Sequence, residues 1–69
     1  MKAISGKEFA KILEQRGWIL LRINGSHHIY GKQGSVAHLS VPIHGHTPIK
    51  KGLLKHLMKL AEIEEDELS

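Results

Sequence analysis

The sequence predicts an α+β domain with the element order α-β-β-β-α, in which two helices cover one face of a three-stranded antiparallel sheet. Apolar residues recur with helical spacing near both ends of the 69-residue chain. Between them, three short apolar segments are separated by tight turns that contain glycine. Helical spacing indicates amphipathic helices, and short strands joined by tight turns indicate an antiparallel meander. Because such a meander has one apolar face, we expect the helices to cover that face and to leave the other partly open.

The first helix is predicted over residues 6–16. Ser5 and Glu8 match a capping box, in which the serine hydroxyl caps the glutamate N–H and the carboxylate reaches back. Gly17 then provides a left-handed stop at the C-terminal end. The apolar positions of this helix recur at i, i+3 and i+4, and they are Phe9, Ile12 and Leu13.

Three strands are predicted over residues 18–23, 27–31 and 35–41, and Pro42 ends the third. Alternation gives each strand two faces. In the first strand we expect the core face to consist of Ile19, Leu21 and Ile23. In the third strand the apolar face consists of Ala37, Leu39 and Val41. Trp18 is interpreted as a core or core-edge residue, because a lone tryptophan usually contributes by burying a large area.

The second helix is predicted over residues 48–61, with Thr47 as its N-cap and Pro48 in its first turn. Its apolar stripe consists of Ile49, Leu53, Leu57 and Leu60, flanked by Leu54, Met58 and Ala61. Residues 64–68 are expected to add at most a short helical turn. The acidic tail, residues 62–69, is interpreted as a solvated end; an extra helical turn and a fold-back onto the basic face are the alternatives.

Composition indicates a single domain over residues 1–69. There is no cysteine, which excludes disulfides and cysteine-based zinc sites, and no apolar run approaches the roughly 18 residues of a membrane span. The N-terminus lacks a secretion signal, so we expect a cytoplasmic protein. Residues 1–61 carry ten Lys and Arg against two Glu, a net charge of +8. A body this basic suits a polyanion, most simply nucleic acid.

The segment with the strongest chemical signal runs from Asn24 to Tyr30. Asn-Gly favours a hairpin turn, and Gly25 has no Cβ to keep a substrate away from the backbone. His27 and His28 follow directly, and imidazole exchanges protons near neutral pH. Taken alone, the segment is better interpreted as a tight turn followed by two surface histidines.

Six histidines in this chain allow two interpretations. One is a metal site, for which His44 and His46 are expected on the same side of an extended loop, near His27 and His28. No Asp or Glu lies between Glu14 and Glu62 and there is no cysteine, which disfavours zinc. The other interpretation is metal-free ribonuclease chemistry. RNA supplies its own 2′-OH nucleophile, and one histidine with a few cations can move protons and stabilise charge on the phosphorane.

Several segments, in order, carry a family resemblance. They are residues 16–18, 22–30, 40–42 and 48–52. In these segments the chain resembles HicA, the small mRNA-cleaving toxin of HicA–HicB toxin–antitoxin modules, also catalogued as YcfA-like proteins. The resemblance covers about residues 4–61. It implies a fold like that of double-stranded RNA-binding domains, which have the same element order. Family members often have a glycine after the second helix, where this chain has Glu62.

The resemblance also implies an activity and a partner. His27 matches the catalytic histidine of the family and Gly25 the glycine of its turn. The implied activity is endoribonucleolytic cleavage of mRNA with no metal or other cofactor. The implied partner is the antitoxin HicB, which covers the active site. Ser26 then shapes the turn beside His27.

Further residues are candidates for RNA contacts. Arg22, Lys50 and Lys51 are candidate phosphate contacts, or else ordinary solubilising charges. Tyr30 is a candidate for stacking a base, or else a packing residue. His28 is the rival of His27, because strand alternation points it to the opposite face, with Tyr30. If Ile29 faces the helices, His27 would point inward as well, and only a bulge or a position at the sheet's rim would free it.

Two other functions compete with the ribonuclease. One is a non-catalytic RNA-binding domain that uses the same basic surface. The other is a structural partner within a larger complex, for which neither cleavage nor salt-dependent RNA binding is expected.

Overall fold

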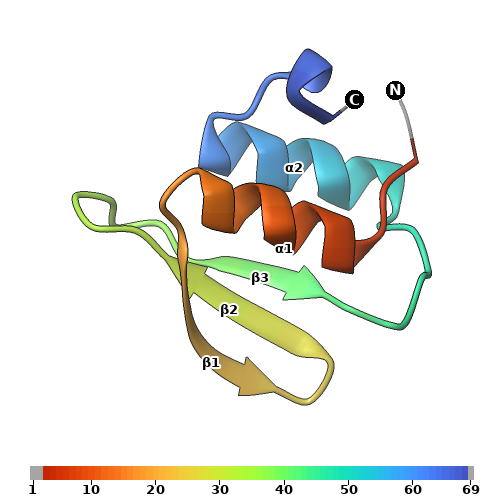
Figure 1. Cartoon of the computed structure of the whole chain (residues 1–69), viewed down its shortest axis with the longest axis horizontal. Coiled ribbons are helices and arrows are strands. Elements are labelled where there is room, and N and C mark those ends of the chain that lie inside the picture. Colours follow the sequence, from red (N-terminus) through yellow and green to blue (C-terminus); the bar gives the residue numbers. More distant parts are fainter. Residues whose placement is uncertain (1–2, 69) are drawn as a thin grey trace.

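The computed structural model describes residues 3–68 and confirms the predicted architecture. The elements are α1 (Gly6–Gln15), β1 (Ile19–Asn24), β2 (His27–Gly31), β3 (Leu39–Pro42), α2 (Lys51–Ala61) and a final 3₁₀ turn, η1 (Glu65–Leu68). The strands form an antiparallel sheet in the order β1-β2-β3. Both helices lie on the same side of the sheet (Figure 1). We call this side the helix face and the opposite side the open face.

The start of α1 has the predicted capping box. The Glu8 N–H donates to Ser5 Oγ at 3.2 Å, and the Ser5 N–H donates to the Glu8 carboxylate at 3.0 Å. Phe9 and Leu13 are fully buried, as their spacing predicts. The helix ends one residue earlier than predicted, and Gly17 supplies the left-handed stop at φ 92°. The first helix was therefore predictable from local sequence alone.

The predicted core face of β1 is wrong. Ile19, Leu21 and Ile23 are all exposed. A bulge at Leu21 interrupts the pairing between Leu20 and Arg22, so that Ile19 pairs with Gly31 and Ile23 with His28, on opposite faces of the sheet. An extra residue in one strand reverses the faces of all residues beyond it. Every residue of β1 is exposed. The core takes Trp18 instead, which lies just before the strand and is 4% exposed.

Alternation in β2 decides what each face carries. Tyr30 pairs with Leu39 and His28 pairs with Val41. Tyr30, Leu39 and Val41 belong to the buried core, so these two rows point to the helix face. His27 and Ile29 lie in the intervening rows and therefore point to the open face. Since Ile29 does not face the helices, His27 needs no bulge in its own strand to reach solvent.

The third strand is shorter than predicted and spans Leu39–Pro42 rather than residues 35–41. The residues that would pair with 35–38 are themselves in a turn, where the Ser35 N–H donates to the Lys32 carbonyl at 3.1 Å. Without a ladder partner, this segment leaves β3 and Val36 is fully exposed. The predicted apolar face holds where the strand exists, because Leu39 and Val41 are both fully buried.

The predicted start of the second helix is wrong by three residues. α2 begins at Lys51 with Lys50 at the N-cap, and no side chain caps it. Pro48 and Ile49 instead run beside the N-terminal segment: Pro48 forms a β-bridge with Ser5, and the Ile49 N–H donates to the Ile4 carbonyl at 2.8 Å. This pairing requires an extended backbone, which keeps Pro48 and Ile49 out of the helix.

The buried stripe of α2 is also shifted from the prediction. Leu53 and Leu60 are each 38% exposed. The residues of α2 that reach the core are Leu54, Leu57, Met58 and Ala61. The helix ends at Glu62, which adopts the left-handed conformation at φ 57°. A side chain in that conformation costs about 1 kcal/mol relative to glycine.

The described part of the acidic tail is not a solvated end. Ile63 and Leu68 are each 5% exposed and belong to the core. Glu67 forms an ion pair with Arg16 at the end of α1. The tail therefore folds back over the helices and away from the sheet (Figure 1).

Candidate active site

The β1–β2 turn holds the predicted Gly-Ser pair. Gly25 has φ 64°, and no atom lies within 4 Å of the position that a Cβ would occupy. Glycine is therefore favoured here because of the positive φ angle, and not because a side chain would clash with the rest of the chain. Because the space outside it is open, another molecule can approach this backbone closely.

His27 is exposed on the open face at the end of this turn. It pairs with Asn24 on one side and with Pro42 on the other. Arg22 lies on the same face, paired with Ile29, two residues along β2 from His27. The open face thus presents an imidazole and a guanidinium in neighbouring rows.

His28 and Tyr30 occupy the helix face, on the other side of the sheet from His27. They line a cavity of about 330 Å³ together with Lys7, Ala10, Lys11, Glu14, Leu20 and Ile43. The Tyr30 hydroxyl donates to the Glu14 carboxylate at 3.1 Å. Burial raises the pKa of Tyr30 to about 12, and the hydrogen bond and the charge of Glu14 act in the same direction. Since Tyr30 is only 2% exposed, its ring packs in the core and offers little surface for a base.

Lys50 lines a groove of about 260 Å³ between the end of β3 and the start of α2. Its lining includes Pro42, the cross-strand partner of His27, together with His44, Leu53 and Lys50. Lys51 is exposed in the first turn of α2 and is not part of this lining. The structure therefore brings His27 and Arg22 to the open face beside the turn of Gly25 and Ser26, and separates His28 and Tyr30 from them. Lys50 and Lys51 lie at the start of α2.

The sequence interpretation missed one neighbour of the turn. His44 Nε2 lies 3.4 Å from Ser26 Oγ, a long hydrogen bond. The two residues are 18 positions apart, and their contact depends on the register of β2 and β3. No local sequence signal reveals that register. A prediction of it requires knowing where β3 begins, and that boundary was wrong.

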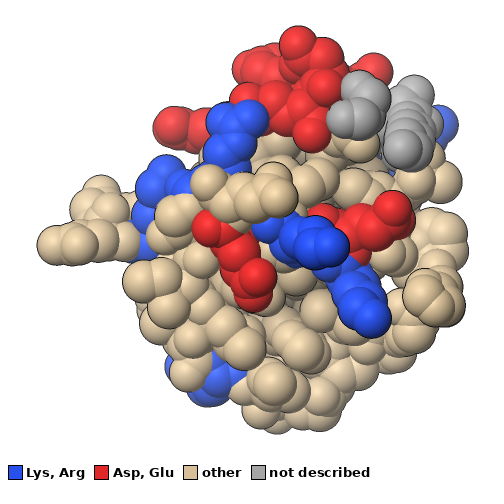
Figure 2. All heavy atoms as spheres, viewed as in Figure 1, with Lys and Arg blue, Asp and Glu red and all other residues tan. Residues whose placement is uncertain are grey.

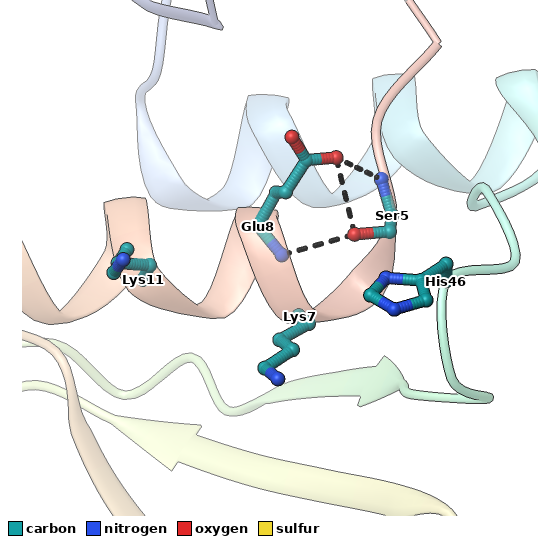
Figure 3. A pocket seen from close by; sticks show the side chains of 5 residues that line it. All are labelled: Ser5, Lys7, Glu8, Lys11 and His46. Atoms are coloured by element: carbon teal, nitrogen blue, oxygen red, sulfur yellow. Dashed lines mark hydrogen bonds between the residues drawn. The ribbon is translucent and has the colours of Figure 1, made fainter.

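The largest of these cavities, about 400 Å³, lies elsewhere, at the start of α1. Figure 3 shows its lining, which consists of Ser5, Lys7, Glu8, Lys11 and His46. Ser5 and Glu8 bond to each other there through the capping box. His46 thus faces α1 while His44 faces the β1–β2 turn, so the expectation of a shared side is wrong. Gly45 at φ 58° and the bond from the Thr47 N–H to the His44 carbonyl, 2.9 Å, turn the loop between them.

The histidines do not converge. Within residues 3–68, no group of three or more His, Cys, Asp or Glu has a geometry suited to a metal ion. His27 and His28 are on opposite faces, and His44 and His46 diverge.

The charges of the described chain are separated in the same way. Residues 15–61 contain no carboxylate side chain, so the three strands and the loop after β3 carry no negatively charged side chain. Arg22 is the one cation in the strands, and most of the lysines lie on α1 and α2. Figure 2 shows the largest group of acidic side chains over the C-terminal segment, at the end of the molecule away from the sheet. The acidic tail therefore repels a polyanion from its end of the molecule.

A comparison with models of protein families assigns the chain to a family. The family model described as the HicA toxin of bacterial toxin-antitoxin matches residues 6–63. The chain belongs to the HicA toxin family. Membership implies a toxin role and an antitoxin partner. The match spans every element from α1 to the end of α2, so the fold and the turn at Gly25 both lie inside it.

No curated protein matches the chain. No helix in the described part of this HicA-family chain is long and apolar enough to cross a membrane.

Proposed function

We propose that this HicA-family toxin is a metal-independent endoribonuclease that cleaves mRNA, with His27 as a proton-transfer residue. The observation that carries the proposal is the position of His27. It is exposed on the open face, directly after a turn whose glycine leaves the backbone accessible. An exposed imidazole can exchange protons with a bound phosphodiester, and an accessible backbone allows the phosphate to approach closely.

The chemistry requires few groups. The 2′-oxygen of a ribose attacks the adjacent phosphorus as its proton passes to a base, and the bond to the 5′-oxygen breaks as that oxygen receives a proton. The products are a 2′,3′-cyclic phosphate and a free 5′-hydroxyl. Negative charge builds on the phosphorane oxygens, and nearby cations and N–H groups stabilise it.

Most of the predicted site residues have a place in this scheme. His27 exchanges a proton with the reacting oxygens, and Gly25 and Ser26 hold the turn that receives the phosphate. Arg22 contacts phosphates from the open face, and Lys50 and Lys51 add charge at the start of α2. The proposal gives His28 and Tyr30 no role in cleavage, because both lie on the helix face.

The family also supplies the biological setting of the proposal. The substrate is mRNA in the cytoplasm, and the partner is a HicB-type antitoxin that covers the open face. A protein that covers His27 and the surrounding cations would block both cleavage and RNA binding. Expression of this chain without its antitoxin should therefore arrest growth, and the His27→Ala variant should not.

The deciding experiment incubates a defined RNA with the purified protein in EDTA, wild type beside His27→Ala. We expect cleavage by the wild type alone, with RNA affinity retained by the variant. The EDTA removes divalent ions, so cleavage there establishes a metal-free reaction. If neither protein cleaves and both bind RNA in a salt-dependent manner, the chain is a binding module and the proposal is wrong.

A further inference from the structure

His44 is joined to the proposed site by two contacts that the family assignment does not explain. The first is the 3.4 Å approach of His44 Nε2 to Ser26 Oγ, next to His27 in the chain. The second is a backbone hydrogen bond of 2.8 Å from the Ile43 N–H to the Ser26 carbonyl. This bond extends the β2–β3 pairing beyond Pro42 and holds the loop after β3 against the turn.

The register places the two imidazoles at a separation that suits a phosphodiester. His27 pairs with Pro42, and His44 follows two residues later. Strands lie about 4.8 Å apart and rise about 3.3 Å per residue, so the two Cα atoms are about 8 Å apart. Both side chains are exposed, and the groove beside Pro42 runs from His44 to Lys50. Side chains from two backbone positions this close can reach one bound phosphodiester.

The other histidines are excluded by position. His28 is on the helix face. His46 lies in the cavity at the start of α1 (Figure 3). His38 lies beside Gly31, which is four residues along β2 from His27 and hence about 13 Å away. His56 is on an exposed position of α2.

We propose that His44 is the second proton-transfer residue of the ribonuclease and that Ser26 is a positioning residue for its ring; this rests on the proposed function. Cleavage moves two protons at different places: one leaves the 2′-oxygen, and one reaches the 5′-oxygen. A single imidazole cannot contact both oxygens from one position, whereas His27 and His44 can approach from two. One ring takes up the 2′-proton as the P–O bond forms, and the other gives up a proton as the P–O5′ bond breaks.

The test measures initial cleavage rates in EDTA for the wild type, His27→Ala, His44→Ala and His46→Ala. His46→Ala is the matched control, because it removes an imidazole from the same loop but from the other side. We expect a bell-shaped pH profile for the wild type and for His46→Ala. His44→Ala should lose about 10²–10⁴ in rate and one limb of the bell.

A substrate with sulfur in place of the bridging 5′-oxygen separates the two roles, because a thiolate leaves without a proton. We expect this substrate to restore the rate of one, and only one, of the variants His27→Ala and His44→Ala. Affinity for 2′-O-methyl RNA and the melting temperature should be unchanged in His44→Ala. A purely structural role for His44 would move those two quantities, and would leave both limbs of the profile in place.

The outcomes distinguish the two proposals. If the wild type does not cleave RNA, the proposed function is wrong. If the wild type cleaves and His27→Ala does not, while His44→Ala behaves like His46→Ala, then only the role of His44 is wrong. Rescue of both variants or of neither by the sulfur substrate would also overturn the division of roles between them.

Discussion

The two faces of the sheet differ more than any other two regions of this protein. On the helix face, Tyr30, Leu39 and Val41 are buried at 0–2% exposure among the apolar residues of both helices. On the open face, the same strands present His27 and Ser40, both exposed. Adjacent residues of one strand therefore serve different purposes. The helix face stabilises a small domain, and the open face remains free for a ligand.

This separation matters for a chain of 69 residues, which can build only one modest core. A catalytic group placed inside that core would replace an apolar contact and would need a buried partner. On the open face, a histidine or an arginine displaces no core contact and needs no buried partner. Activity and stability should therefore respond to different substitutions, even between neighbouring residues.

The largest expected difference between the faces is in catalysis, between His27 and His28. His27→Ala should lower the rate of RNA cleavage by about 10²–10⁴, the usual contribution of acid–base catalysis. His28→Ala should retain most of the wild-type rate, because its side chain is on the helix face. Initial rates on one defined RNA measure both. Equal losses of cleavage rate in His27→Ala and His28→Ala would contradict the proposed difference between the two faces.

The next effect is on stability and compares Leu39 with Ser40. Leu39→Ala should lower the free energy of unfolding by about 2–5 kcal/mol, because the leucine is fully buried. Ser40→Ala should change it by less than about 0.5 kcal/mol, since the serine is exposed on the open face. Urea unfolding followed by circular dichroism gives both values. A cost for Ser40→Ala as large as for Leu39→Ala would contradict the assignment of faces.

A smaller effect concerns Tyr30 on the helix face and depends on pH. Tyr30→Phe should cost about 1 kcal/mol near neutral pH, through the lost hydrogen bond to Glu14. The folded pKa, about 12, lies above the ordinary value of 10.0, so only the unfolded chain ionises between these values. Stability of the wild type should therefore fall relative to Tyr30→Phe as the pH rises through this range. Paired unfolding curves at pH 8 and above pH 10 test this; a constant difference would contradict it.

The smallest effect concerns Glu62, far from the open face. Glu62→Gly should stabilise the protein by about 0.5–1 kcal/mol, because glycine adopts φ 57° without strain. The neighbouring variant Glu64→Gly has no positive φ to relieve and serves as control. Thermal melting measures both, and RNA cleavage should be unchanged in each. A loss of stability in Glu62→Gly would show that the carboxylate contributes more than the strain costs.

Features encoded within a few residues were predictable from the sequence. The capping box at Ser5, the turn at Gly25 and the limits of β2 depend on neighbours in the chain, and the structure has all three. The faces of β1 were not predictable. Its apolar residues, Ile19, Leu20, Leu21 and Ile23, fit either face, and the bulge at Leu21 depends on pairing with β2.

The remaining errors also come from distant contacts. α2 starts late because Pro48 and Ile49 pair with the N-terminal segment, more than 40 positions away in the chain. Thr47 and Pro48 are a good helix start by themselves, but the backbone bonds to Ser5 and Ile4 occupy this segment. The contact between Ser26 and His44 has the same origin. It exists because β2 and β3 pair in one particular register.

The most direct test of the central claim is an NMR titration with RNA that cannot be cleaved. A 2′-O-methyl oligonucleotide is added to labelled protein, and the ring signals of His27, His44 and His28 are followed. The account predicts large shifts for His27 and His44, with little change for His28. Shifts at His28 and on α1, with His27 and His44 unaffected, would place RNA on the helix side and contradict the account.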